Sequence, residues 1–239
     1  MVSNKIPLFA LVLVSVLGCT SRDAGRPEAA AAAVTTQSTD DRAVVLFLGT
    51  SLTAGLGVGP EQAYPSVIQQ KIDSLRLPFL VVNAGESGGT SAGGLARIDW
   101  LLRRPVAVLV LELGANDGLR GQSTAALSDN LQEIIDRTRA AYPQAKIVIV
   151  GMEALPNLGA RYTKEFRQVF VDLSRANHTA LVPFLLEGVG GIEELNQADG
   201  IHPTARGHRV VAETVWRVLY PVLDSLVSDR SDRTATRQD

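Results

Sequence analysis

The feature that most constrains the fold of this chain is a regular alternation between short apolar runs and longer amphipathic segments. Five continuous apolar runs are predicted to be strands: residues 43–48, 79–82, 106–113, 147–150 and 181–182. Runs without polar interruption are typical of strands that are buried on both faces, as in a parallel sheet. We therefore expect these segments to form the centre of the fold.

The segments between and after the strands have apolar residues at helical spacing. They cover residues 61–76, 91–103, 124–142, 162–177 and 204–226. Strand–helix alternation of this kind predicts a parallel sheet with helices on both faces. We place the domain at residues 43–227, a length that suits a single hydrophobic core.

The polar residues that follow the predicted strands are candidates for a functional site. Ser51 follows the first strand, Gly85 the second and Asn116 the third, and Asp199 and His202 lie in a loop before the last helix. In a doubly wound sheet, ligands bind outside the carboxyl ends of the strands. We therefore expect these four loops to converge on one crevice.

The residue types in these loops suit nucleophilic catalysis. A serine hydroxyl such as that of Ser51 needs an adjacent base, which His202 can provide. A carboxylate three positions before a histidine, as at Asp199, can hold the imidazole in one tautomer. Candidate donors to a developing oxyanion are the N–H groups of Ser51 and Gly85 and the side-chain amide of Asn116. An Asp-x-x-His pair alone is more often a surface ion pair, so this hypothesis depends on the convergence of the loops.

Composition and motifs disfavour several other functions. The net charge of −2, with scattered basic residues, gives no indication of nucleic-acid binding. The glycine-rich stretches 55–59 and 85–94 match neither the P-loop nor the dinucleotide-binding pattern. Thr53 replaces the second glycine of G-x-S-x-G, which disfavours the α/β-hydrolase fold. The three histidines show no metal-ligand spacing, so we expect no metal site, and no cofactor is indicated.

Other polar and aromatic residues have simpler interpretations. Glu112 and Asp117 are expected to cap backbone groups or form loop ion pairs, and His208 is expected to be structural or on the surface. Trp100 and Trp216 lie in helical stripes and are predicted to be core residues.

Four stretches resemble the sequence blocks of the SGNH (GDSL) hydrolase family, in the order of that family. They are residues 49–52, 83–85, 114–117 and 199–202, and the resemblance extends over residues 44–223. The run 195–203 is especially similar to the bacterial arylesterase, thioesterase and lysophospholipase subgroup. The resemblance implies a three-layer α/β/α flavodoxin-like fold with a parallel five-stranded sheet.

The resemblance also implies a function and a set of site residues. The function is hydrolysis of small acyl or aryl esters, or of thioesters or lysophospholipids, through an acyl-enzyme on Ser51. The triad would be Ser51, His202 and Asp199, and the oxyanion donors would be Ser51, Gly85 and Asn116. One departure is Thr50, which occupies the place of the aspartate in Gly-Asp-Ser-Leu. Two alternatives stay open: a carbohydrate O-deacetylase, and a non-catalytic surface lipoprotein with a vestigial pocket.

The N-terminal segment resembles a lipoprotein signal peptide. Residues 1–19 contain Lys5, an apolar stretch and then Gly18 before Cys19, the only cysteine of the chain. We expect Cys19 to carry the lipid anchor of a periplasmic or cell-surface protein; the alternative is an ordinary secretory signal. Residues 20–42 are predicted to be a flexible tether and residues 228–239 a disordered tail. Nothing in the sequence specifies an oligomeric state.

Overall fold

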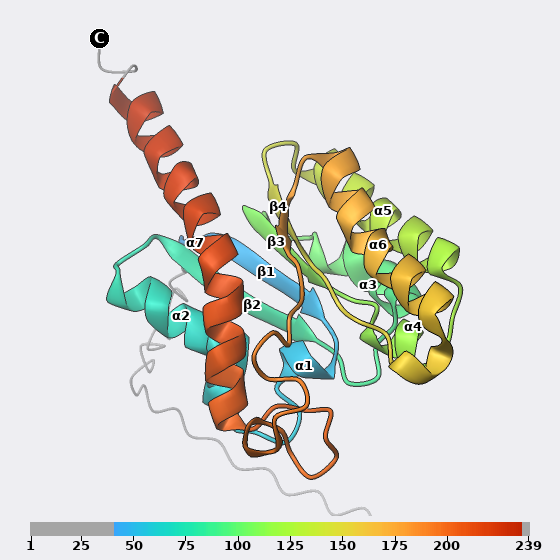
Figure 1. Cartoon of the computed structure of the whole chain (residues 1–239). Helices are drawn as coiled ribbons and strands as arrows, with labels where there is room; N and C mark the ends of the chain where they lie inside the picture. Colours follow the sequence, from blue (N-terminus) through green and yellow to red (C-terminus); the bar gives the residue numbers. More distant parts are fainter. Residues whose placement is uncertain (1–40, 236–239) are drawn as a thin grey trace, which may run out of the picture. The chain divides into compact units, whose positions relative to one another are not determined.

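A central parallel sheet organises residues 41–235, the part of the chain that the computed structural model describes. Its strand order is β2-β1-β3-β4-β5 (Figure 1). The strands are β1 (Ala43–Gly49), β2 (Phe79–Gly85), β3 (Val108–Glu112), β4 (Lys146–Val150) and β5 (Ala180–Val182). Every neighbouring pair runs parallel, which confirms the five-stranded parallel sheet.

Helices cover both faces of this sheet, as the alternating pattern predicts. Helices α2 (Tyr64–Ser74) and α7 (Ala205–Ala235) lie on one face. Helices α3 (Ser91–Leu101), α5 (Thr124–Ala141) and α6 (Ala160–Asn177) lie on the other (Figure 1). The α/β/α arrangement with three layers is therefore confirmed.

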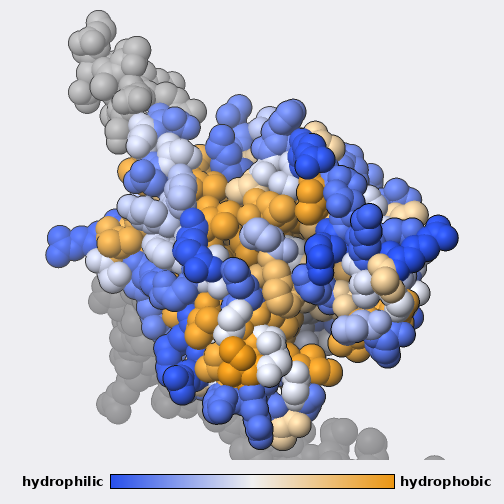
Figure 2. Space-filling view, viewed as in Figure 1, coloured by the Kyte–Doolittle hydropathy of each residue, from blue (hydrophilic) through white to orange (hydrophobic). Residues whose placement is uncertain are grey.

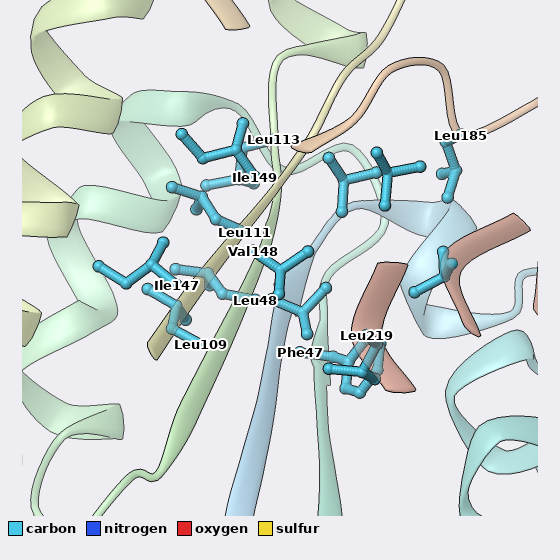
Figure 3. Close-up of a cluster of buried hydrophobic side chains, with 14 of the residues drawn as sticks. Phe47, Leu48, Leu109, Leu111, Leu113, Ile147, Val148, Ile149, Leu185 and Leu219 are labelled. Atoms are coloured by element: carbon cyan, nitrogen blue, oxygen red, sulfur yellow. The ribbon is translucent and has the colours of Figure 1, made fainter. Parts of the chain in front are cut away.

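The core lies on both faces of the central strands. Figure 3 shows Leu109, Leu111 and Ile149 toward one helical layer, and Phe47 beside Leu219 of α7 on the other side. All five side chains are at most 1% exposed. In the view of Figure 2, apolar residues gather between α7 and the α5–α6 pair, whereas the outward faces of these helices are mainly hydrophilic. Continuous apolar runs thus became strands with two buried faces.

Two short helices at the carboxyl end of the sheet were not predicted. Helix α1 (Ser51–Ala54) directly follows β1, and α4 (Ala115–Leu119) follows β3. Helices of one turn are too short to show a helical period in the sequence. Short 3-10 helices also occur at Pro60–Gln62, Pro156–Leu158 and Glu193–Leu195.

Trp100 is not a core residue, against the prediction. Trp100 is 64% exposed, whereas Ile98 is fully buried. Two positions along a helix correspond to about 200° of rotation, so the buried Ile98 places Trp100 on the outer face. Trp216 is partly buried and packs against the core.

The C-terminal segment also differs from the prediction, because α7 continues to Ala235. No glycine or proline follows Pro221 in this helix, and polar residues alone do not end a helix.

The last residues of the predicted tether are described as well, and Arg42 Nη1 lies 2.9 Å from Asp73 Oδ1. The predicted signal peptide, Cys19 and the rest of the tether lie outside the described residues. Within residues 41–235, no helix is long and apolar enough to cross a bilayer.

Candidate active site

The proposed nucleophile stands at the start of α1, immediately beyond β1. Thr50 is the N-cap of this helix, and its hydroxyl accepts the Leu52 N–H at 3.3 Å. Ser51 is the first helical residue and is 9% exposed. Gly55, with φ +77°, ends the helix in a left-handed conformation that favours glycine. The chain therefore turns sharply around Ser51 at the carboxyl end of the sheet.

Asp199 and His202 lie in a hydrogen-bonded loop between β5 and α7. The loop is closed by the bridge between Asn196 and Pro203 and by a bond of 2.7 Å from the Gln197 N–H to the His202 carbonyl. Asp199 Oδ1 accepts the N–H groups of Ile201 and His202 at 2.9 and 3.0 Å. Its other oxygen, Oδ2, lies 2.6 Å from His202 Nδ1.

The structure brings the two halves of the site together. Ser51 Oγ lies 2.9 Å from His202 Nε2, although 151 positions separate the two residues in the sequence. The His202 side chain is only 16% exposed. Bonds from the His202 N–H, the His202 imidazole and the Ile201 N–H hold the pKa of Asp199 well below its ordinary value. Asp199 is therefore a carboxylate at neutral pH and accepts the Nδ1 proton, which leaves the Nε2 lone pair facing Ser51.

Gly85 has a packing role in the structure. Its N–H donates to Asn83 Oδ1 at 2.9 Å, so it is not free to bind an oxyanion, against the prediction. The Asn83 amide donates in turn to the Thr53 carbonyl at 2.8 Å. A Cβ at Gly85 would lie 2.2 Å from the Ala54 nitrogen. Glycine at this position therefore lets β2 and α1 approach each other closely.

Gly88, in the next turn, offers the N–H group that Gly85 does not. The turn is closed by a bond of 3.0 Å from the Gly89 N–H to the Glu86 carbonyl, and Gly88 has φ +78°. Within residues 41–235, the N–H groups of Gly88 and Ser51 have no hydrogen-bond partner. Sequence reasoning missed Gly88, although a Gly-Gly pair after a strand indicates a turn that needs positive φ.

Asn116, in α4, lies against the same turn. Its Nδ2 donates to the Gly89 carbonyl at 2.9 Å, which leaves its second amide hydrogen without a partner within the described residues. Asp117 accepts the Ser91 N–H and hydroxyl at 2.9 and 2.6 Å, and so joins α4 to α3. The capping role expected for Asp117 is consistent with these bonds.

His208 is buried behind the site and has a structural role. It is 1% exposed, its ring stacks on Tyr64, and its Nδ1 accepts the Tyr64 N–H at 3.3 Å. Burial, with a smaller contribution from the charge of His202, lowers the pKa of His208 to about 4. His208 is therefore neutral at physiological pH. Among the side chains that the structure describes, no group of three or more His, Cys, Asp or Glu is placed to hold a metal ion.

The family model of the GDSL-like lipase/acylhydrolases matches residues 47–210, a range that includes Ser51, Asn116, Asp199 and His202. The chain belongs to this family. As a GDSL-like hydrolase, it is a carboxylic ester hydrolase.

One relative of this GDSL-like hydrolase is named as an esterase, and another as a thioesterase, protease and lysophospholipase. The chain is 42% identical over 180 residues to Esterase TesA of Pseudomonas aeruginosa. The aligned residues cover 75% of this chain and 89% of that protein. It is 35% identical over 182 residues to Thioesterase 1/protease 1/lysophospholipase L1 of Escherichia coli strain K12, covering 75% of this chain and 85% of that protein.

A solved structure supports the same assignment. The psychrotrophic esterase EstA from Pseudoalteromonas, inhibited by monoethylphosphonate, matches with a TM-score of 0.71 and 31% identity. The match covers 76% of this chain and 98% of that chain. The fold of this GDSL-like hydrolase is thus shared with an esterase of known structure.

Proposed function

We propose that this GDSL-like hydrolase is a serine esterase that cleaves small acyl and aryl esters through an acyl-enzyme on Ser51. One observation carries the proposal: Ser51 Oγ, the His202 imidazole and the Asp199 carboxylate are joined by contacts of 2.9 and 2.6 Å. This arrangement pairs a nucleophile with a base and the base with an orienting acid.

The proposed reaction has two halves. His202 Nε2 takes the Ser51 proton as the hydroxyl attacks the ester carbonyl, and the imidazolium is stabilised by Asp199. The imidazolium then protonates the leaving alkoxide, and the acyl group remains on Ser51. In the second half, water loses a proton to His202 as it attacks the acyl carbonyl. The bond between the acyl group and Ser51 Oγ then breaks, the imidazolium returns the proton to Ser51 Oγ, and the acid is released.

The oxyanion of each tetrahedral intermediate is proposed to bind three donors. They are the N–H groups of Ser51 and Gly88, which are free among the described residues, and the second amide hydrogen of Asn116. Removing one such donor typically lowers turnover by about 10²–10³-fold. Replacing Asn116 by Ala should therefore lower kcat by this factor.

The range of substrates is proposed from the relatives. One relative is named as a thioesterase and lysophospholipase and another as an arylesterase. An acyl-enzyme mechanism acts on the acyl carbonyl and accepts alkoxide, aryloxide or thiolate leaving groups, so we include thioesters and lysophospholipids. No observation favours acetylated carbohydrates as the main substrates.

We also propose that the protein is exported and anchored by a lipid on Cys19. The proposal is supported by the apolar segment before Gly18-Cys19 in the sequence. Two or more acyl chains give stable membrane anchoring, so the protein should fractionate with membranes. Replacing Cys19 by Ser should release it into the soluble extracytoplasmic fraction, and an unchanged membrane fraction would contradict the anchor.

The esterase proposal is tested by replacing Ser51 with Ala and assaying short-chain p-nitrophenyl esters. Loss of a triad member typically lowers kcat by about 10⁴–10⁶-fold, so turnover should fall to near the background rate. A matched control is Ser174→Ala, which removes a buried hydroxyl of α6 that bonds to the Thr179 carbonyl. The control should keep its activity, and equal turnover by Ser51→Ala and the wild type would contradict the proposal. Acetylated sugars assayed in parallel test the deacetylase alternative.

A further inference from the structure

Glu112 is a buried carboxylate without a cation beneath the turn that carries Ser51. It ends β3, pairs in register with Gly49 of β1 and is 1% exposed. Within residues 41–229, whose side chains are described, no Lys, Arg or His side chain donates to it. Burying a carboxylate without a cation costs free energy of folding unless hydrogen bonds compensate for the lost water. The groups that donate hydrogen bonds to Glu112 therefore need an explanation.

All the donors to this carboxylate come from the nucleophile turn. Glu112 accepts the Thr50 N–H at 2.8 Å, the Thr50 hydroxyl at 3.1 Å and the Thr53 hydroxyl at 2.7 Å. Thr50 and Ser51 share a peptide plane, which contains the Thr50 carbonyl and the Ser51 N–H. Bonds on both sides of Ser51 therefore fix the direction of the Ser51 N–H, the proposed oxyanion donor.

The packing around Glu112 leaves little freedom for the turn. A Cβ at Gly49 would lie 2.0 Å from Thr53 Oγ1 and 2.6 Å from Glu112 Oε2. Thr53 Oγ1 also lies 2.7 Å from the hydroxyl of Tyr64, a fully buried residue of α2. The carboxylate is thus held at a position that only a glycine at residue 49 permits.

We propose that Glu112 is a positioning residue for ester hydrolysis, whose carboxylate holds the Thr50–Ser51 peptide so that the Ser51 N–H meets the oxyanion. This inference rests on the proposed function of Ser51. Glu112 does not touch the substrate; it acts through Thr50 and Thr53. Neutralising this carboxylate should weaken the bond to the Thr50 N–H, because a charged acceptor binds more strongly than a neutral one.

The protonation of Glu112 makes the role measurable. Burial raises the pKa of Glu112 to about 7, against the lowering effect of the bonds from Thr50 and Thr53. Four titratable or charged groups contact the residues around Glu112. Tyr64 of α2 bonds to Thr53, and Arg97 of α3 donates to the Gly49 carbonyl. His202 contacts Ser51, and His208 accepts the Tyr64 N–H. Burial, with a contribution from Glu112, raises the pKa of Tyr64 well above its ordinary value, so Tyr64 stays neutral.

The expected pH dependence follows from these groups. Above pH 8 Glu112 is ionised and holds the turn, and below pH 6 it is neutral and holds the turn less well. Effects of pH on groups other than Glu112 are common to the wild type and to its Glu112 variants. The comparison between wild type and variant therefore isolates the contribution of Glu112.

The test compares kcat of the wild type and of Glu112→Gln for an aryl ester between pH 5.5 and 8.5. A misplaced catalytic group costs about 10- to 100-fold, so kcat of the variant should be lower by this factor at pH 8.5, with KM within about twofold. The ratio should approach one at pH 5.5, where Glu112 is neutral in the wild type. A ratio that does not change with pH would overturn the proposal.

Two controls separate positioning from general destabilisation. Ile135→Val shortens a fully buried side chain of α5, far from Ser51 in the sequence, and should keep kcat although it lowers the melting temperature. An equal loss of kcat in this control would overturn the proposal.

If Glu112→Gln does not fold, Glu112→Asp is tested in its place. This variant keeps the negative charge but withdraws it from Thr50, so its kcat should fall at least about tenfold. An unchanged kcat would overturn the inference. An inactive Ser51→Ala beside a fully active Glu112→Gln would overturn only this inference, whereas an active Ser51→Ala would overturn the proposed function.

Discussion

The chemistry of single residues in this site depends on which of their atoms are already hydrogen-bonded. His202 faces Ser51 with Nε2 because Asp199 Oδ2 accepts at Nδ1, at 2.6 Å. Gly85 is not free because Asn83 holds its N–H, and Gly88 is free in the same loop. These bonds decide the roles of residues that look equivalent in the sequence.

Replacing Asp199 by Asn tests the tautomer of His202. The new amide can still accept the N–H groups of Ile201 and His202 through its oxygen, so the loop should keep its form. Its NH2 group would donate to Nδ1 and place the proton on Nε2, which then cannot accept from Ser51. We expect kcat to fall by about 10³–10⁴-fold with little change in KM or melting temperature. A kcat within tenfold of the wild type would show that Asp199 does not orient the base.

Replacing Thr50 by Asp restores the residue that is usual in Gly-Asp-Ser-Leu. The new carboxylate would face Glu112 at the position where the Thr50 hydroxyl now donates at 3.1 Å. Two carboxylates that share a site raise the pKa of one of them. The acid limb of the kcat profile should therefore move to higher pH by about one unit or more. Profiles of variant and wild type that superimpose would contradict this coupling.

The sequence was sufficient to nominate Ser51, Asp199 and His202, because residue type and order along the chain carry that information. It was not sufficient for the backbone donors. Whether a glycine N–H is free depends on a neighbouring side chain such as Asn83, and on a turn geometry that residue types do not specify. The burial of Glu112 beneath Thr50 was hidden for the same reason.

At the scale of elements, the position of α1 depends on its close contact with β2. A Cβ at Gly85 would meet the Ala54 backbone at 2.2 Å, and backbone atoms cannot move aside as a flexible side chain can. We expect Gly85→Ala to lower the free energy of unfolding by about 1–3 kcal/mol and to lower kcat, because α1 carries Ser51. Urea denaturation and steady-state kinetics measure the two effects.

Gly93 of α3 provides the matched control for this substitution. A Cβ there would meet no atom closer than 3.6 Å, and Ala is favoured over Gly within a helix by about 1 kcal/mol. Gly93→Ala should therefore be neutral or stabilising and fully active. If both variants were equally stable, the close contact between β2 and α1 would not be a constraint.

The long elements were predictable because hydrophobic periodicity marks them. The apolar run before Gly49 became β1, and the stripe of Phe166 and Phe170 became the buried face of α6. Helices α1 and α4 were not predictable, because four or five residues do not define a period. The exposed position of Trp100 depends on the rotation of α3 about its axis, which Ile98 and Leu102 fix by packing.

At the scale of the whole molecule, two buried groups make opposite contributions to stability as the pH falls. Glu112 has a folded-state pKa of about 7, above its unfolded value of 4.5, so the folded state binds the extra proton and acidification stabilises it. His208 has a folded-state pKa of about 4, below its unfolded value of 6.5, so the unfolded state binds the extra proton and acidification destabilises the fold.

Single replacements should expose these opposing effects. Between pH 8 and pH 5 each group changes the free energy of unfolding by about 2 kcal/mol, with opposite sign. The quantity to compare is the free energy of unfolding of each variant minus that of the wild type. From pH 8 to pH 5 this difference should fall by about this amount for Glu112→Gln and rise by a similar amount for His208→Gln. Urea denaturation at the two pH values measures both differences, and changes of the same sign would contradict the assignment.

The arrangement of the whole sheet was only partly predictable. Alternation of strands and helices predicts parallel strands with helices on both faces, and this is observed. The order β2-β1-β3-β4-β5 depends on which side of β1 each connection returns to, and apolar runs do not encode that choice. The convergence of the four loops followed from the parallel direction of the strands rather than from their order.

The central claim is that Ser51 is the nucleophile of an ester hydrolase, and covalent trapping tests it most directly. The full chain is treated with an alkyl fluorophosphonate, and its intact mass and peptide map are measured by mass spectrometry. We predict one phosphonyl adduct per chain, located on Ser51, with loss of esterase activity in proportion to labelling and no adduct on Ser51→Ala. An unlabelled wild-type protein that still hydrolyses esters, or an adduct on another residue that abolishes activity, would contradict the account.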